Sequence, residues 1–241
     1  MRLMIRCLIP LVGWSTGLLA EPLVWGYSPS DPPPYVNMTG AELDNSVTRD
    51  LGELVAASLD RKLSFVAVPN NRIEEALKSA RIHLICNTQP QWHSQPELLH
   101  WSAVLYEDAD VLATPANRAA PRNLANLQGA LVGTTIGYHY SSELTQAFER
   151  GDLVRRDVRN IETRLKMLER GRLDASVDLR RALSYQLQRH PAEIRVSDWP
   201  LEHFALRCAA PKTTPGSADL IETIDQLLTS GQIRHILNRY Q

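Results

Sequence analysis

Residues 81–92 read RIHLICNTQPQW. The apolar run from Ile82 to Cys86 changes abruptly into the polar sequence NTQ, and a proline and a tryptophan follow. This pattern is typical of a buried strand that turns polar where the chain leaves a sheet. Whether the polar tip is only a turn or also holds a ligand depends on the rest of the chain.

The residues before this strand alternate between strand and helix patterns. Strands are predicted at 22–27, 62–69 and 81–87, and helices at 47–59 and 70–80. In the first helix, apolar residues recur at the spacing of a helix with one buried face, and Asn45 or Ser46 can cap its N-terminus. Residues 22–87 therefore predict a β-α-β-α-β unit.

The alternation continues in the second half of the chain. After an extended segment at 107–116, strands are predicted at 130–138, 152–158, 172–179 and 203–211, and helices at 141–151, 160–171, 180–190 and 217–241, the last one broken at Gly231. Strands that alternate with short helices predict parallel sheets covered on both faces, which is an α/β fold. Two such units joined by extended segments indicate two lobes.

The first twenty residues have the pattern of a secretory signal peptide. Arg2 and Arg6 precede an apolar run that ends on a small residue, Ala20. A membrane anchor is the alternative, but the 14-residue run from Cys7 contains Pro10 and is shorter than the ~20 apolar residues that a spanning helix needs. Export to the periplasm is therefore the prediction.

The charge balance excludes one class of partner. Without residues 1–20, 24 basic residues face 27 acidic ones. Nucleic-acid binding rests on concentrated positive charge, so no nucleic-acid partner is expected. The closest approach to a basic patch, at Arg155, Arg156 and Arg159, is interpreted as a solvated face.

The predicted strand ends carry aromatic and amide side chains. Ligands of open α/β sheets bind outside the carboxyl ends of the strands. These ends carry Tyr27, the loop to Tyr35, residues 70–72, 87–92 and 137–140, and Asp178 with Arg180 and Arg181. Aromatic walls with few polar groups describe a small-molecule pocket better than a reaction centre.

The order of several segments resembles the family 3 periplasmic solute-binding proteins, the amino-acid receptors of ABC importers. The segments are YSPSDPPPYV (27–36), DLGELVAASL (50–59), NTQPQWHSQPELLHWSAVLYEDADVL (87–112), LQGALVGTTIGYHY (127–140) and LKMLERGRLDASVDLRRALSY (165–185). The resemblance implies a type II binding-protein fold, with one lobe from 21–112 plus 206–241 and the other from 113–205. Crossover strands at 108–115 and 203–211 would join the lobes, and hinge closure would enclose the ligand.

The resemblance also implies site residues. Tyr35, after two prolines, matches a Pro-Pro-aromatic motif whose ring stacks on the ligand. Asp178 matches an aspartate that binds the ligand's α-ammonium. Tyr138 and His139 stand where the family normally has a Gly-Thr-Thr grip. Trp92 stands where the family has an arginine that grips the α-carboxylate, so the chain departs from the family at this position.

The missing arginine changes the expected ligand. Paired charge-assisted bonds to a carboxylate are worth roughly 1.5 to 3 kcal/mol each, and an indole has only one N–H to offer. Either Arg72 or Arg181 replaces the arginine, or the ligand lacks that carboxylate. Asn87 and Gln89 would contribute mainly through their backbone groups. Rings beside a carboxylate make a cationic or aromatic ligand physically reasonable.

Each predicted site residue also has a structural interpretation. Trp92 can be a core residue beneath the following loop, and Tyr35 can simply pack the proline loop. Asp178 can cap the helix that follows it, since aspartate is a common N-cap. His139 can be a surface histidine.

The resemblance places Cys86 at a strand end of the first lobe and Cys208 on a crossover strand that enters the same lobe. A disulfide is predicted between them, with Cα atoms roughly 4.4 to 6.8 Å apart and no farther than about 7 Å. Two unpaired buried thiols are the alternative.

The predicted function is capture of a small polar, aromatic or cationic solute for delivery to an ABC importer, by a monomer without metal or cofactor. The membrane permease of that importer would be the protein partner. A periplasmic dehydratase-like enzyme on the same scaffold is one alternative, although no catalytic motif is present in the sequence. A soluble sensor that reports to a membrane signalling protein is another.

Overall fold

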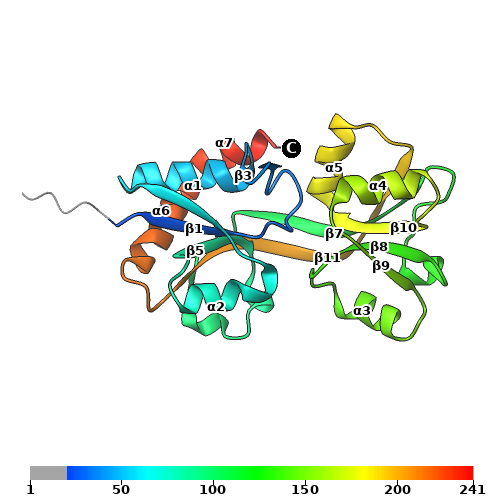
Figure 1. Ribbon diagram of the computed structural model, residues 1–241, viewed down its shortest axis with the longest axis horizontal. Coiled ribbons are helices and arrows are strands. Elements are labelled where there is room, and N and C mark those ends of the chain that lie inside the picture. Colours follow the sequence, from blue (N-terminus) through cyan, green and yellow to red (C-terminus); the bar gives the residue numbers. More distant parts are fainter. Residues whose placement is uncertain (1–20, 241) are drawn as a thin grey trace, which may run out of the picture.

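The computed structural model describes residues 21–240 (Figure 1). The predicted signal peptide, residues 1–20, lies outside these residues. The helices and strands form two bodies, here called the first and the second lobe, which two long strands connect (Figure 1). Within residues 21–240, no helix is both long enough and apolar enough to span a membrane.

The first lobe is built around three parallel strands. They are β1 (Leu23–Tyr27), β4 (Leu63–Ala67) and β5 (Leu84–Thr88), with α1 (Val47–Ser58) and α2 (Ile73–Lys78) between them. β1 lies in the middle and is parallel to both neighbours. Ser46 caps α1, because its hydroxyl accepts a hydrogen bond from the backbone N–H of Arg49 at 3.3 Å. The predicted β-α-β-α-β unit is confirmed.

The second lobe repeats this arrangement. Its elements are β8 (Leu131–Thr135), α3 (Ser142–Glu149), β9 (Val154–Val158), α4 (Ile161–Glu169), β10 (Ala175–Leu179) and α5 (Arg180–Arg189). β8 lies between β9 and β10 and is parallel to both. Ser141 caps α3 and Asn160 caps α4, each by accepting a backbone N–H three residues on. The helices and strands predicted in this half are therefore confirmed.

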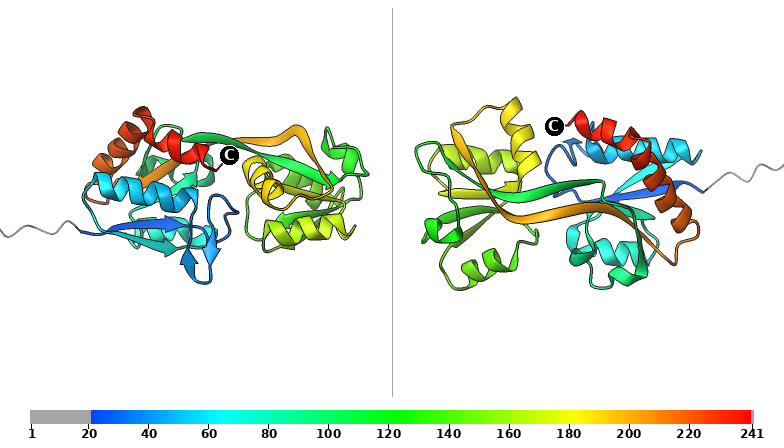
Figure 2. Two further views of the ribbon diagram at one scale, coloured as in Figure 1. Left: turned by 90° about the horizontal axis from the view of Figure 1, so that it is seen from above. Right: turned by 180° about the vertical axis from the view of Figure 1, so that it is seen from behind.

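Two antiparallel strands connect the lobes. β7 (Tyr106–Pro115) and β11 (Ile194–Pro211) pair with each other along most of their length, and Figure 2 shows them side by side between the lobes. β11 also pairs with β5 in the first lobe, and β7 pairs with β10 in the second. The strands thus form a sheet in the order β4-β1-β5-β11-β7-β10-β8-β9. The sequence predicted a strand only from residue 203, but β11 begins at Ile194. Its first part was missed because Pro200 and two register shifts interrupt the alternation of the strand.

The chain returns to the first lobe to end. α6 (Ser217–Thr229) and α7 (Gln232–Asn238) pack on α1, with the predicted break at Gly231, whose φ of +82° is left-handed. Several small elements were not predicted from the sequence. They are β2 (Met38–Thr39), β3 (Glu42–Leu43), β6 (Leu99–Trp101) and the 3₁₀ turns Asn70–Arg72, Pro90–Trp92, Pro96–Leu98 and Leu124–Leu127.

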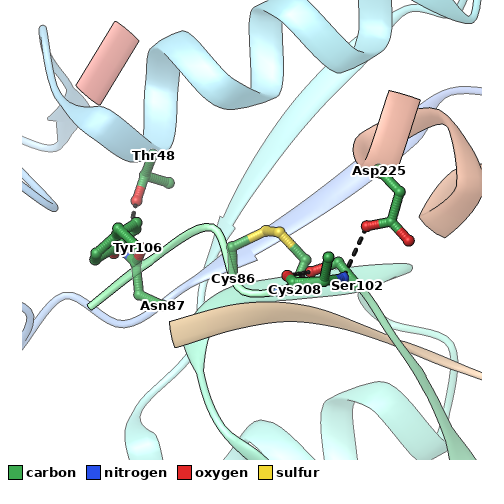
Figure 3. Close-up of a disulfide and its surroundings, with 8 residues drawn as sticks. Thr48, Cys86, Asn87, Ser102, Tyr106, Cys208 and Asp225 are labelled. Atoms are coloured by element: carbon green, nitrogen blue, oxygen red, sulfur yellow. Dashed lines mark hydrogen bonds between the residues drawn. A yellow bond between two sulfur atoms is a disulfide. The ribbon is translucent and has the colours of Figure 1, made fainter. Parts of the chain in front are cut away.

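A disulfide joins β5 to β11. Cys86 and Cys208 are bonded, with Cα atoms 3.9 Å apart, and both residues are buried (Figure 3). The predicted bridge is confirmed, with a Cα separation inside the 7 Å limit and below the expected range. Ser102 also holds Cys208 in position, because its hydroxyl accepts a hydrogen bond from the backbone N–H of Cys208 at 2.9 Å. The bridge therefore anchors the end of a connecting strand to the wall of the first lobe.

Candidate functional site

The larger pocket between the lobes lies at the carboxyl ends of β1 and β5. We call it the main pocket. It is lined by Ser28, Asp31, Asn70, Ile73, Glu74, Ile85, Cys86, Asn87, Thr88, Trp92 and His93 of the first lobe and by Tyr138 and His139 of the second. The stretch that follows β5 therefore does more than turn the chain, because it forms one wall of a pocket.

Asn87 holds the floor of the main pocket through both ends of its amide. Its Oδ1 accepts a hydrogen bond from the hydroxyl of Tyr106, and its Nδ2 donates to Oγ1 of Thr48 at 3.3 Å (Figure 3). Its backbone is left-handed, with φ at +56°, a conformation that asparagine tolerates better than most residues. The amide side chain therefore links β7 to α1, and its role is not limited to the backbone.

Trp92 lies in the 3₁₀ turn after β5 and is only partly buried. Its ring packs edge-on against Phe204 of β11, with centroids 5.2 Å apart, and against Tyr138 of the second lobe at 6.3 Å. The indole thus contacts a connecting strand and the opposite lobe while it lines the main pocket. Trp92 therefore does both things that the sequence left open: part of its ring packs against neighbouring side chains, and part of it forms a wall of the main pocket.

A second, smaller pocket is also lined by residues of both lobes. It is lined by Ser30 and Pro32 of the first lobe and by Asp110, Thr135, Tyr138, Tyr140, Val177, Asp178 and Leu179. Tyr138 lines both pockets. We call this the second pocket.

Asp178 lines the second pocket but already has a cationic partner. Arg164 of α4 donates two hydrogen bonds to its carboxylate, and the hydroxyl of Ser176 donates a third. The pair is buried, with the side chains of Arg164 and Asp178 exposed by 2% and 1%. Gly133 makes room for it, because a Cβ there would lie 3.3 Å from Cδ of Arg164 and 2.6 Å from Leu173.

Tyr35 is held in a buried network instead of lining either pocket. Its ring stacks on Tyr106 at 5.7 Å, and its hydroxyl donates a hydrogen bond to Asp108. The same carboxylate accepts the backbone N–H of Arg181 at 3.2 Å and so caps α5, which has no side-chain cap of its own. Tyr106 already covers one face of the Tyr35 ring. Stacking of this ring on a ligand stays a prediction.

The remaining predicted residues lie in different places. His139 is exposed and lines the main pocket, whereas Gln89 is buried and outside both pockets. Arg72 is exposed beside the main pocket without lining it. Arg181 holds its guanidinium 5.4 Å from the ring centroid of Tyr106, also outside both pockets. Neither candidate replacement for the missing arginine lines the main or the second pocket.

Burial perturbs the carboxyls of both pockets. Desolvation raises the pKa of Asp31 to about 7, although a hydrogen bond with Asn87 lowers it in part. Burial also raises the pKa of Asp110 well above its usual value, and repulsion from Asp178, Glu202 and Asp108 adds to this effect. No lysine or arginine of residues 21–240 lines the main or the second pocket, whereas four carboxyl residues do. In the same residues, no cluster of three or more His, Cys, Asp or Glu is placed to hold a metal ion.

Three residues that line these pockets or bind a lining residue were missed in the sequence. Asp31 sits in the loop that leads to Tyr35, at a strand end that was already singled out. Arg164 occupies the buried face of a predicted helix, where a charged residue signals a buried partner. Asp110 lies in a run that was interpreted only as a crossover strand, and the sequence offers no signal for its place beside Asp178.

Neither a protein-family model nor a curated protein sequence matches this chain. Solved structures are nevertheless similar to it over nearly its whole length. The substrate-binding protein of an amino acid ABC transporter is 17% identical, with a TM-score of 0.70 over 90% of this chain and 98% of that one. The GluR0 ligand-binding core from Nostoc punctiforme, in complex with L-glutamate, is 17% identical, with a TM-score of 0.72 over 91% and 99%.

A third similar structure is an ancestral amino acid-binding protein described as a precursor of cyclohexadienyl dehydratase. It is 17% identical, with a TM-score of 0.70 over 90% of this chain and 94% of that one. The two-lobed α/β fold that the sequence predicts is thus confirmed. At this level of identity the likeness establishes the fold, and the residues of the pockets must carry the functional argument.

Proposed function

We propose that this chain is an exported solute-binding protein that captures a small cationic, and preferably aromatic, solute between its lobes and delivers it to an ABC importer. One observation carries the proposal: rings and four carboxyl residues line the pockets between the lobes, without a lysine or arginine among the described residues. The periplasm is the proposed location, a membrane permease the proposed partner, and a monomer the proposed state.

The pocket chemistry opposes an anionic ligand. A carboxylate placed in the main pocket would meet Asp31 and Glu74, and one placed in the second pocket would meet Asp110. No lysine or arginine of the described residues lines either pocket to bind it, and the guanidinium of Arg164 is already engaged by Asp178. A cation gains instead from the same carboxylates. The faces of Trp92 and Tyr138 add attraction of about 0.5 to 2 kcal/mol per ring.

Capture would proceed by closure of the lobes. We propose that the lobes divide within β7 and β11, with 21–112 plus 206–241 on one side and 113–205 on the other. This division is supported by strand pairing, since β11 joins the first lobe through β5 and β7 joins the second through β10. Bending at two adjacent strands is the hinge motion that lets two lobes enclose a ligand.

A thermal-shift and titration screen of residues 21–241 tests this function. The panel contains amines, basic and aromatic amino acids, quaternary ammonium compounds, neutral sugars and carboxylates. A cation at 100 times its Kd should raise the free energy of unfolding by about 2.7 kcal/mol. For a chain of this size that raises Tm by roughly 5 to 10 °C. If no compound stabilises the protein, the capture function is wrong.

An enzyme on the same scaffold is the second candidate. Asp31 favours it, because a carboxyl in a pocket with a pKa of about 7 is suited to general acid or base catalysis. A similar structure is described as the precursor of a dehydratase. Mass spectrometry of a bound ligand after long incubation separates the two functions, since a binding protein returns the ligand unchanged. A pull-down from membranes would test the sensor alternative, in which the partner is a signalling protein and not a permease.

A further inference from the structure

Asp110 of β7 is a buried carboxyl with one oxygen that has no partner. The residue is 2% exposed. Its Oδ1 accepts a hydrogen bond from the hydroxyl of Tyr138 at the long distance of 3.5 Å, and its Oδ2 has no partner. Buried polar atoms are almost always hydrogen-bonded, so an unpartnered carboxylate oxygen that faces a pocket calls for an explanation.

The neighbours of Asp110 do not supply a counter-charge. Strand pairing sets Asp110 opposite Leu179 of β10 and Glu202 of β11, which brings Asp178 and Glu202 close to it, and Asp108 lies two residues before it on β7. The nearby cation, Arg164, is engaged by Asp178. The site therefore gathers carboxyl groups and offers Asp110 no free cation among the residues that line it.

The second pocket places this oxygen where a ligand can reach it. Ser30 and Pro32, from the loop after β1, lie on one side of the pocket, and the other lining residues come from β7 and the second lobe. Opening of the lobes would move the first-lobe loop away from Asp110. The rings of Tyr138 and Tyr140 lie 4.9 Å apart beside it and provide apolar walls.

We propose that Asp110 binds the positively charged group of the ligand, an ammonium or guanidinium, through its free oxygen. This inference rests on the proposed function and narrows it to cationic solutes. The resemblance assigned the ammonium contact to Asp178, but Arg164 already occupies that carboxylate. Asp110 is the carboxyl of the second pocket that has an oxygen available.

Binding should release a proton. In the free protein, burial and the acidic neighbours raise the pKa of Asp110, which favours the protonated carboxyl. A bound cation stabilises the carboxylate, and the proton leaves to buffer. The groups that face Asp110 are Asp178 with Arg164, Glu202, Asp108, Tyr138 and Tyr140. Asp31 in the main pocket titrates separately at about pH 7 and needs its own control.

The test compares matched probes on the wild type and on single variants of residues 21–241. The probes are tyramine, tryptamine, agmatine and putrescine, with 4-hydroxyphenylacetate as the anionic match to tyramine. For the cation that binds best, Asp110→Asn should weaken affinity about 10- to 100-fold, because the variant keeps the shape and loses the charge. Glu202→Gln, which alters a neighbouring charge outside the pocket, should change affinity less than about threefold.

Calorimetry gives a second readout that needs no variant at Asp110. Titration of the wild type in two buffers of different ionisation enthalpy should show that binding releases a substantial fraction of one proton. The Asp31→Asn variant should release the same fraction. The inference is overturned if Asp110→Asn binds the cation like the wild type, or if no proton is released. If the anionic probe binds and the cations do not, the capture function is retained and the role of Asp110 is refuted. If no probe binds, both fall.

Discussion

Arg164 and Asp178 form an ion pair inside the second lobe, with side chains exposed by only 2% and 1%. The pair joins α4 to β10, and a third donor, Ser176, completes the hydrogen bonding of the carboxylate. A buried carboxylate with this set of donors is fully compensated without a ligand. The pair therefore belongs to the framework of the second lobe.

Removal of Arg164 should destabilise the protein strongly. Arg164→Ala leaves the carboxylate of Asp178 buried without a counter-charge, which costs about 3 to 5 kcal/mol. The free energy of unfolding from urea titration measures the loss. Arg150→Ala is the matched control, because it removes an exposed arginine paired with Asp152 and should cost at most about 1 kcal/mol. Equal losses in the two variants would contradict the framework role.

Trp92 should contribute more to ligand affinity than to stability. Trp92→Ala removes a ring that faces the main pocket, and we expect affinity for a bound cation to fall about tenfold or more. The ring is partly exposed, so the loss of stability should stay below the ~3 to 5 kcal/mol of a fully buried tryptophan.

Trp199→Ala is the control for this prediction. Trp199 packs against a core cluster of the second lobe and lines neither pocket. It should lower stability and leave affinity unchanged. Titration calorimetry and urea unfolding of both variants give the comparison. Unchanged affinity in Trp92→Ala would make that indole a core residue only.

The disulfide should stabilise the chain by about 2 to 5 kcal/mol. It closes a loop of 122 residues in the unfolded chain, and loops of this length give the larger values in chain-entropy models. Urea unfolding of residues 21–241 with and without a phosphine reductant measures the effect. The Cys86→Ala, Cys208→Ala double variant should show no response to the reductant. A response in that variant would mean that the reductant acts elsewhere.

Asp31 should make stability fall as pH rises. Its pKa is about 7 in the folded protein and near 3.8 in the unfolded chain. Because the folded state holds the proton more tightly, its contribution is complete below pH ~4 and is lost as pH rises through 7. The difference in unfolding free energy between the wild type and Asp31→Asn should therefore shift against the wild type from pH 4 to 8.

Asp44→Asn controls for a general effect of pH. Asp44 is partly exposed, and hydrogen bonds from Thr39 and from the backbone of Asn45 lower its pKa. Its difference from the wild type should be flat between pH 5 and 8, since the group stays ionised there. A flat profile for Asp31→Asn as well would refute the raised pKa of Asp31.

Local patterns carried most of the fold prediction, and long-range contacts account for what it missed. The caps at Ser46, Ser141 and Asn160 and the break at Gly231 depend on a few neighbouring residues, so the sequence reveals them. The start of β11 depends instead on long-range pairing with β7. Pro200 and the register shifts interrupt the local strand pattern, so the sequence alone does not reveal it.

For the candidate site too, local sequence patterns identified some residues, and long-range contacts account for those that were missed. Trp92 was found because it follows a strand end, and it lines the main pocket. Asp110 was missed because its neighbours come from β10 and β11, which no local pattern brings together. The partner of Asp178 was missed for the same reason, although Arg164 on an apolar helix face was visible in the sequence.

The order in which the two lobes can be completed follows from the path of the chain. Residues of the second lobe are contiguous, whereas the first lobe needs the end of β11, α6 and α7 to cover its sheet and to supply Cys208. As the polypeptide emerges from the ribosome, the middle of the chain can therefore acquire protease resistance while the N-terminal portion still lacks the C-terminal residues that complete the first lobe. We expect a fragment that ends at residue 205 to yield a protected core from 113–205 on limited proteolysis, and rapid digestion of that core would contradict this order.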